Sequence, residues 1–181
     1  MEQLDIFGSE TYEYLFVIEP DQKTTERVIE LRMFVNSIIP LSEETLHSKP
    51  HISICYFEAS DYSDDLILTK VNQVLSSIHS FDIRVEGSEQ WKNGTLVLNI
   101  NPDESILDLQ KQLAGVFKGV IKTFHLTIAR HIAAKFSDQL PIESFQYKNE
   151  FKCESIHILK KKGNKPYQIL DTIYLKKTAR S

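Results

Sequence analysis

The sequence predicts an α+β fold with two lobes, in which two mainly antiparallel sheets with flanking helices surround a central groove. Segments with strand-like alternation are mixed with segments of helical spacing along 181 residues, without the strict rhythm of a doubly wound parallel sheet. A four-residue motif, in which a histidine and a hydroxyl residue are each followed by an apolar residue, occurs at 51–54 and again at 125–128. Since strand and helix material precedes each copy, we interpret the chain as an internal duplication in which each half gives one motif strand to the groove.

The N-terminal half is expected to contain strands over 12–18, 51–57, 81–85 and 95–100, and helices over 21–38 and from Asp64 to Ile78. Apolar residues at helical spacing, among them Val28 and Val35, support the first helix, which ends at Pro40. Asp64 and Asp65 stand where the N-cap of the second helix belongs. Asn93-Gly94 is a turn signal ahead of the strand over 95–100.

The C-terminal half is expected to contain one helix and three strands. Asp103 caps the helix, which runs through Lys118. The strands cover 124–129, 151–159 and 167–175, with a turn at 162–164 between the last two. No linker stands out, so we expect one bilobal domain over 12–181, preceded by an N-terminal extension over 1–11.

Composition bounds the class of protein. No apolar run approaches the 18 or more residues of a membrane span, and the N-terminus lacks the pattern of a signal peptide. Cys55 and Cys153 have neither metal spacing nor a disulfide framework, and Cys55 is expected to be a buried thiol within a strand. We therefore expect a cytoplasmic protein with no membrane partner, and a monomer is the default.

Charge is unevenly distributed along the chain. The net charge of −4 argues against broad binding of duplex nucleic acid. Residues 1–110 contain 7 Lys+Arg and 20 Asp+Glu, whereas residues 111–181 contain 14 and 5. The C-terminal part can thus supply a basic wall for a phosphate group or a short RNA end. Equally, the lysines at 160–162 and 176–177 can be solvated turn and tail residues.

The repeated motif places chemistry on one face of each strand. In His51-Ile52-Ser53-Ile54 and His125-Leu126-Thr127-Ile128, the histidine and the hydroxyl share a face, because residues two apart in a strand do so. With a phosphodiester between the strands, a neutral imidazole takes a proton from the attacking oxygen and a protonated one gives a proton to the leaving oxygen. Ser53 and Thr127 would donate hydrogen bonds to the non-bridging oxygens. The scheme needs no metal or cofactor, and a third ligand at zinc spacing is lacking. Either histidine taken alone can equally be structural.

Three further residues are candidates for substrate binding, each with a structural alternative. Arg130 can pair with a phosphate through its fork of donors or form a surface ion pair. Tyr167 can stack on a base or pack. Trp91 can also stack on a base, but because it lies next to a turn we interpret it as a lid over the core.

These motifs resemble the signature of the 2H phosphoesterase superfamily. Within it, the chain is most similar to the bacterial 2′-5′ RNA ligase-like proteins, also called RNA 2′,3′-cyclic phosphodiesterases. Pro50 precedes the first histidine, as it often does there, and the second motif continues as Ala129-Arg130. The stretch 155–175 is similar to the closing strand pair of the family, whose tyrosine sits at the groove. Ser53 stands where threonine is commoner, and residues 58–120 match in element order only.

The resemblance implies a bilobal 2H phosphoesterase-like fold and metal-independent hydrolysis of 2′,3′-cyclic phosphate ends of RNA or small nucleotides, typically to a 2′-phosphate. It implies that His125 activates water and that His51 protonates the leaving 3′-oxygen, with these roles exchanged in ligation. It implies that the substrate is bound by Ser53, Thr127, Arg130 and Tyr167. Relatives also cleave 2′-5′ linkages, open ADP-ribose cyclic phosphate or trim RNA 3′ ends. The alternatives are a non-catalytic nucleotide or RNA-end binding module on the same fold and a partner-binding domain with incidental motifs.

Overall fold

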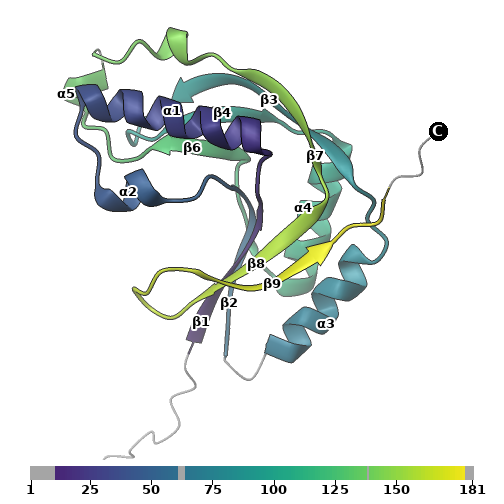
Figure 1. The fold of residues 1–181 in the computed structure, drawn as a ribbon. Helices are drawn as coiled ribbons and strands as arrows, with labels where there is room; N and C mark the ends of the chain where they lie inside the picture. The colour runs from purple at the N-terminus through teal and green to yellow at the C-terminus, as the bar shows by residue number, and fades with distance from the viewer. Residues whose placement is uncertain (1–10, 61–63, 138, 178–181) are drawn as a thin grey trace, which may run out of the picture.

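Two antiparallel sheets form the frame of the protein (Figure 1). The computed structural model describes residues 11–60, 64–137 and 139–177. The first sheet consists, in spatial order, of β5 (Val120–Ile121), β2 (Ile52–Ser60), β1 (Thr11–Ile18), β8 (Ser155–Lys161) and β9 (Gln168–Tyr174). The second consists of β6 (His125–Ala129), β4 (Leu96–Asn101), β3 (Phe81–Gln90) and β7 (Lys148–Cys153). The predicted α+β fold with two antiparallel sheets is confirmed.

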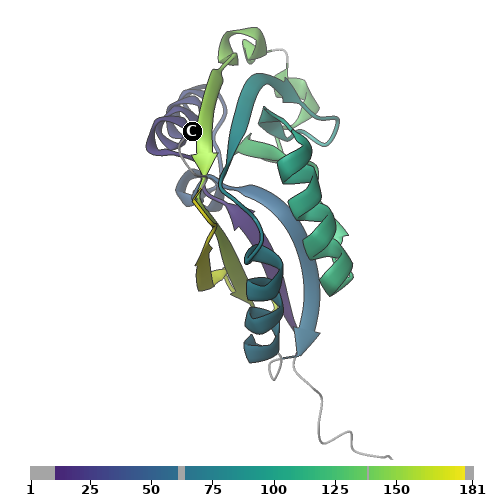
Figure 2. The ribbon, with the colours of Figure 1, turned by 90° about the vertical axis from the view of Figure 1, so that its right-hand side faces the viewer.

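The two longest helices each cover the sheet that does not contain the strand before them. The helices are α1 (Gln22–Ile38), α2 (Glu43–His47), α3 (Asp64–Leu75), α4 (Glu104–Phe117) and α5 (Ala134–Ser137), with a 3-10 helix η2 (Ile142–Phe145). α1 follows β1 of the first sheet but packs against β6 of the second, whereas α4 follows β4 of the second sheet but packs against β2 of the first (Figures 1 and 2). Their buried side chains belong to one continuous hydrophobic core, to which α1 gives Val28, Leu31 and Val35 and α4 gives Ile106, Leu109 and Leu113.

The two motif strands pair with their neighbours in matching registers. Ser53 of β2 lies opposite Val17 of β1, and Thr127 of β6 lies opposite Val97 of β4. In each pair of strands, a register irregularity falls directly beside this valine. The correspondence supports the internal duplication that the sequence predicts.

The capping residues seen in the sequence set the ends of the long helices. The Asp21 carboxylate accepts a hydrogen bond of 2.9 Å from the Thr24 amide at the start of α1. Asp103 caps α4 in the same way, and Lys118 ends it in the left-handed conformation. The predicted limits of these two helices are confirmed.

Two other predicted elements have different ends. α3 begins at Asp64, so Asp64 and Asp65 stand in its first turn rather than at the N-cap, and it ends before Ile78. β3 continues past Val85, because Gly87 at φ +85° accommodates an irregularity that interrupts the alternation of the strand.

The strand predicted over 151–159 is wrong, because two strands of different sheets share this segment. β7 ends at Cys153 in the second sheet, and β8 begins at Ser155 in the first. The buried positions are Phe151 and Cys153 before the crossing and Ile156 and Ile158 after it. The alternation therefore changes phase where the chain changes sheet. The short elements β5, α2, α5 and η2 were also not predicted.

Several expectations concern the chain as a whole. Residues 1–10, most of the predicted extension, lie outside the described residues, whereas Thr11 already pairs with Ser60 as part of β1. Cys55 and Cys153 are free and buried, as predicted for Cys55. In the described part of the chain, no helix is long and apolar enough to cross a membrane.

Two glycines near the end of α4 provide a matched test of how closely this segment approaches β2. A Cβ atom on Gly119 would lie 2.2 Å from the Cys55 Sγ atom and 2.9 Å from the Tyr56 carbonyl oxygen, whereas one on Gly115 would meet nothing within 4 Å. We expect Gly119→Ala to lower the free energy of unfolding by about 1–3 kcal/mol through overpacking. Gly115→Ala should raise it by roughly 0.5 kcal/mol, because alanine favours a helix. Urea unfolding measures both changes, and an equal response of the two variants would contradict the described approach.

Candidate active site

The two motif histidines are oriented by the same local hydrogen bond. His51 Nδ1 lies 3.0 Å from the Lys49 carbonyl oxygen, and His125 Nδ1 lies 2.7 Å from the Thr123 carbonyl oxygen. Because a carbonyl oxygen only accepts, Nδ1 carries the proton in each ring. The Nε2 atom of each ring is then a lone-pair base when the imidazole is neutral and a donor when it is protonated.

The hydroxyls follow the strand pattern that the sequence predicts. Ile54 and Ile128 are fully buried, whereas Ser53 and Thr127 are half-buried on the same strand faces as the histidines. Neither hydroxyl forms a hydrogen bond with another residue that the structure describes. Both are therefore available to donate to a bound anion.

The pKa values of the two histidines depend on burial and on the charge of Arg130. Burial lowers the pKa of both imidazoles, although the Nδ1 hydrogen bonds partly oppose this effect. The Arg130 guanidinium lowers both pKa values, and the charge of His51 lowers the pKa of His125. His51 directly precedes β2 and His125 is the first residue of β6, and these two strands contact each other.

One carboxylate distinguishes the two histidines. Glu19 raises the pKa of His51, whereas among the described residues no carboxylate acts in this way on His125. Glu19 also pairs with Lys49 Nζ at 2.6 Å and lies 3.7 Å from His157 Nε2. Of the two motif histidines, only His51 therefore has a negative charge that favours its protonated form.

Arg130 is exposed at the end of the second motif. The alternative interpretation, a surface ion pair, is not found among the residues that the structure describes. Its guanidinium therefore gives the site a cation whose parallel donors match the oxygens of a phosphate group.

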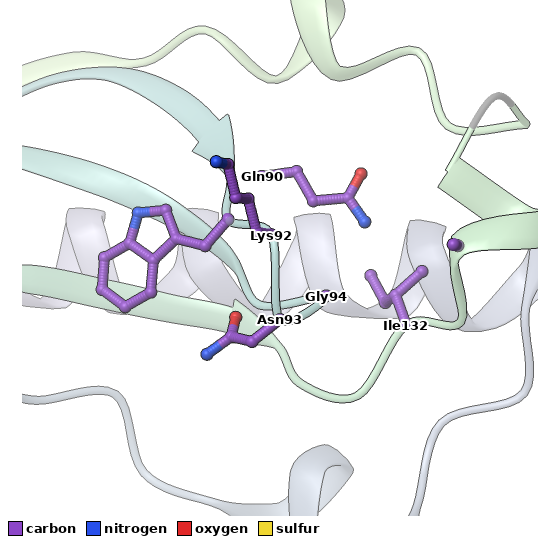
Figure 3. A pocket seen from close by; sticks show the side chains of 7 residues that line it. Gln90, Lys92, Asn93, Gly94 and Ile132 are labelled. Carbon is purple, nitrogen blue, oxygen red and sulfur yellow. The ribbon is translucent and has the colours of Figure 1, made fainter.

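Trp91 lies against the second histidine, which corrects its interpretation as a lid over the core. Its ring meets the His125 ring edge-on, with centroids 4.6 Å apart and an interplanar angle of 67°. The indole also borders a pocket of about 430 Å³, lined further by Gln90, Lys92, Asn93, Gly94, Ile132 and Ala134. In Figure 3, Ile132 lies beside Gly94 of the turn that joins β3 to β4, and its amide donates a hydrogen bond of 3.0 Å to the Gly94 carbonyl oxygen.

Tyr167 lies away from the histidines. Its hydroxyl donates a hydrogen bond of 3.2 Å to Glu13, and burial raises its pKa. His51 precedes Ile52, which pairs with Ile18 at the opposite end of β1 from Glu13. At about 3.3 Å per residue, the two ends are roughly 15 Å apart. The described contacts of Tyr167 are thus with the far end of the first sheet.

The lysines at 160 and 161 form neither of the two arrangements considered from the sequence. Lys160 pairs with Asp64 at 2.8 Å, and Lys161 pairs with Glu13 at 2.9 Å. Their side chains are only 15% and 24% exposed. Their interpretation as solvated turn residues is therefore wrong, and a basic wall formed by the C-terminal part would have to come from other cations.

Two buried polar side chains that the sequence analysis missed bind the backbone of the motifs. Arg32 of α1 is 2% exposed and donates to the carbonyl oxygens of Ile128 and Ser48 at 3.1 and 2.6 Å. Gln110 of α4 is 5% exposed and donates to those of Ile54 and Lys122 at 2.8 and 2.7 Å. The sequence did contain a signal for their burial. Each lies four residues after one core residue and three before another, so its side chain is on the buried face of its helix.

Comparison with known proteins identifies the family. The sequence model of the 2′-5′ RNA ligase superfamily matches residues 20–165, a range that includes both motifs. The chain belongs to this superfamily. This result confirms the 2H phosphoesterase superfamily that the motifs predicted, and the membership supports a phosphoesterase activity. No curated protein matches the sequence significantly.

Solved structures share the fold at low sequence identity. E. coli LigT without ligand has a TM-score of 0.68 and 16% identity, with 93% of this chain and 99% of LigT covered. TT0787 of Thermus thermophilus has a TM-score of 0.72 and 16% identity, with 91% and 98% covered. The MHV ns2 PDE domain has a TM-score of 0.57 and 11% identity, with 82% and 99% covered. LigT has also been solved with 3′-AMP, ATP and phosphate.

Charge-removing variants test the electrostatic arrangement of this phosphoesterase. We expect NMR titration to give pKa values below the ordinary value for His51 and His125. Both should rise in Arg130→Gln, because a neighbouring positive charge disfavours imidazolium. In Glu19→Gln, only the pKa of His51 should fall further. All three shifts should shrink at high salt. An Arg130→Gln variant that changes the pKa of only one histidine would contradict the effect of Arg130 on both imidazoles.

Proposed function

We propose that this protein is a metal-independent phosphodiesterase that hydrolyses 2′,3′-cyclic phosphate ends of RNA or nucleotides, or 2′-5′ phosphodiester linkages. His51 and His125 perform the acid–base chemistry. The observation that supports this most is their matched orientation, in which each ring donates Nδ1–H to the carbonyl two residues earlier and leaves Nε2 for the substrate. The same requirement for one basic and one acidic nitrogen applies to both kinds of diester.

The reaction on a cyclic end transfers one proton at each histidine. His125 Nε2 accepts a proton from water as the water oxygen attacks phosphorus. The bond from phosphorus to the 3′-oxygen breaks, and this oxygen receives the proton of His51 Nε2, which leaves a 2′-phosphate. Ser53, Thr127 and Arg130 donate to the non-bridging oxygens, where negative charge increases in the transition state. Solvent then exchanges protons with both rings and restores the starting state.

The charges around the site support this division of roles. The reaction requires one protonated and one neutral imidazole at the same time. Glu19 favours the proton on His51, and the positive charge of His51 disfavours a proton on His125. These two effects act toward an acidic His51 and a basic His125, whereas burial, Arg130 and Arg32 lower the pKa of His51.

RNA 3′ ends and small cyclic nucleotides are the proposed partners. The structures of LigT with 3′-AMP and ATP support nucleotide binding on this fold. In this protein the indole of Trp91, next to His125 and the adjoining pocket, is the proposed surface for a base.

Removal of either histidine tests the proposed activity. We expect His51→Ala and His125→Ala to lower kcat on 2′,3′-cyclic nucleotides and on RNA with a cyclic end by about 10²–10⁴-fold, in buffer with excess chelator. The matched control is His47→Ala, because this histidine is 79% exposed and its partner among the described residues is Glu43 on α2. Chromatography of the product identifies the position of its phosphate.

Other outcomes of this experiment would contradict the proposal. Full activity in both single variants would exclude two-histidine catalysis. Tight nucleotide binding without turnover of cyclic or 2′-5′-linked substrates would support the binding module instead. Activity that chelator abolishes and added metal restores would exclude the metal-independent reaction.

The base surface has its own test. Trp91 is the only tryptophan of the chain, so its fluorescence reports ligand binding beside His125. We expect saturable emission changes with 3′-AMP. Trp91→Leu should weaken 3′-AMP binding by about tenfold or more, because stacking on an aromatic ring is worth about 1–3 kcal/mol per base. Binding of inorganic phosphate, measured by calorimetry, should change much less. An equal loss for both ligands would show that the indole supports only the imidazole.

A further inference from the structure

Arg32 and Gln110 make equivalent connections in the two halves of the duplication. Arg32 joins the carbonyl of Ile128, the fourth residue of the second motif, to that of Ser48, three residues before His51. Gln110 joins the carbonyl of Ile54, the fourth residue of the first motif, to that of Lys122, three residues before His125. Each side chain therefore connects one motif strand to the segment that leads into the other histidine.

We propose that Arg32 and Gln110 are positioning residues that fix the separation and relative orientation of the two motif histidines. The segments they hold also contain the carbonyls that orient the imidazoles, since Lys49 follows Ser48 and Thr123 follows Lys122. A shift of either segment thus moves an Nε2 atom relative to the opposite strand. The catalytic consequence rests on the proposed function, because acid–base transfer to one phosphate requires both Nε2 atoms in place.

The hydrogen bonds of Arg32 favour positioning over charge as its role. A buried guanidinium is ordinarily compensated by a carboxylate, but the described partners of Arg32 are four backbone carbonyls, with Thr127 and Leu46 added to the two above. Gln110 occupies the corresponding place without any charge. What the two share is the ability to donate to two chain segments at once, which a fork of nitrogens or an amide group provides.

The experiment compares Arg32→Gln, Arg32→Lys and Gln110→Leu with matched core variants. The controls are Val28→Ala and Ile106→Val, because these residues lie one turn earlier on the same helices, face the same core and do not bind the motif backbone. The first readout is independent of activity: the imidazole NMR resonances and their titration, with inorganic phosphate as the probe of the site. The second is the separation of kcat from KM on the substrate that wild type turns over.

We expect each of the three variants to shift the resonances of both histidines and to lower kcat by about 10–100-fold with a smaller change in KM, since misplacement by about 1 Å can cost 10²-fold. The control variants should lower the melting temperature and leave the resonances of both imidazoles and kcat unchanged.

Arg32→Lys should fail to restore wild-type behaviour, because an ammonium group lacks the fork of donors. Full rescue by lysine would assign the role to charge and overturn the proposal. The proposal would also be overturned if the variants shifted the resonances of only the nearer histidine. The same holds if their resonances and kcat matched those of the control variants at an equal loss of stability. If the variants of one of these two residues do not fold, the variants of the other residue test the proposal. An inactive wild type would refute the proposed function and leave the NMR test intact.

Discussion

The site depends on the buried carbonyl groups of Ile54 and Ile128, which lie at the register irregularities of the two motif strands. β6 is an edge strand of the second sheet, and β2 pairs with β5 only from Cys55 onward. The carbonyls of Ile128 and Ile54 lie under helices, so they need donors from within the protein. Arg32 and Gln110 supply side-chain donors, and the Lys122 amide also donates to the Ile54 carbonyl at 3.4 Å. Both can do so because each helix packs across the sheet of the other half, which brings a side chain of one half to a motif strand of the other.

The electrostatics of the site follow from the same arrangement. Arg32 lies buried behind the motif strands and Arg130 lies exposed at the end of the second, and both lower the pKa of His51. Glu19 opposes them but is already paired with Lys49. The imidazoles are therefore surrounded mainly by positive charge, which favours a bound phosphate and disfavours two protonated histidines at once. A bound anion would in turn raise both pKa values, so substrate itself helps to set the protonation state that the reaction needs.

What the sequence predicts well is local, and what it misses depends on contacts between distant segments. His51 and Ser53 share a face because they are two residues apart in one strand, and Asp21 caps α1 from three residues away. Trp91 meets His125 only because the turn after β3 folds against β6, and no periodic pattern carries that information. Arg32 could be predicted to be buried from its place on the apolar face, but its partner carbonyls could not.

The duplication is intertwined rather than laid end to end. The first sheet takes β1 and β2 from the N-terminal part and β8 and β9 from the C-terminal part, while the strands of the second lie between them in the chain. The change of sheet at Glu154 that interrupts the predicted strand closes this arrangement, and the Glu154 carbonyl accepts a hydrogen bond of 2.8 Å from the Leu175 amide. Each motif strand thus receives its helix cover and its buried donor from the opposite half. Packing alone allows two sheets to slide by small amounts, whereas directed hydrogen bonds to motif carbonyls oppose such sliding, and a reaction shared between two imidazoles depends on that resistance.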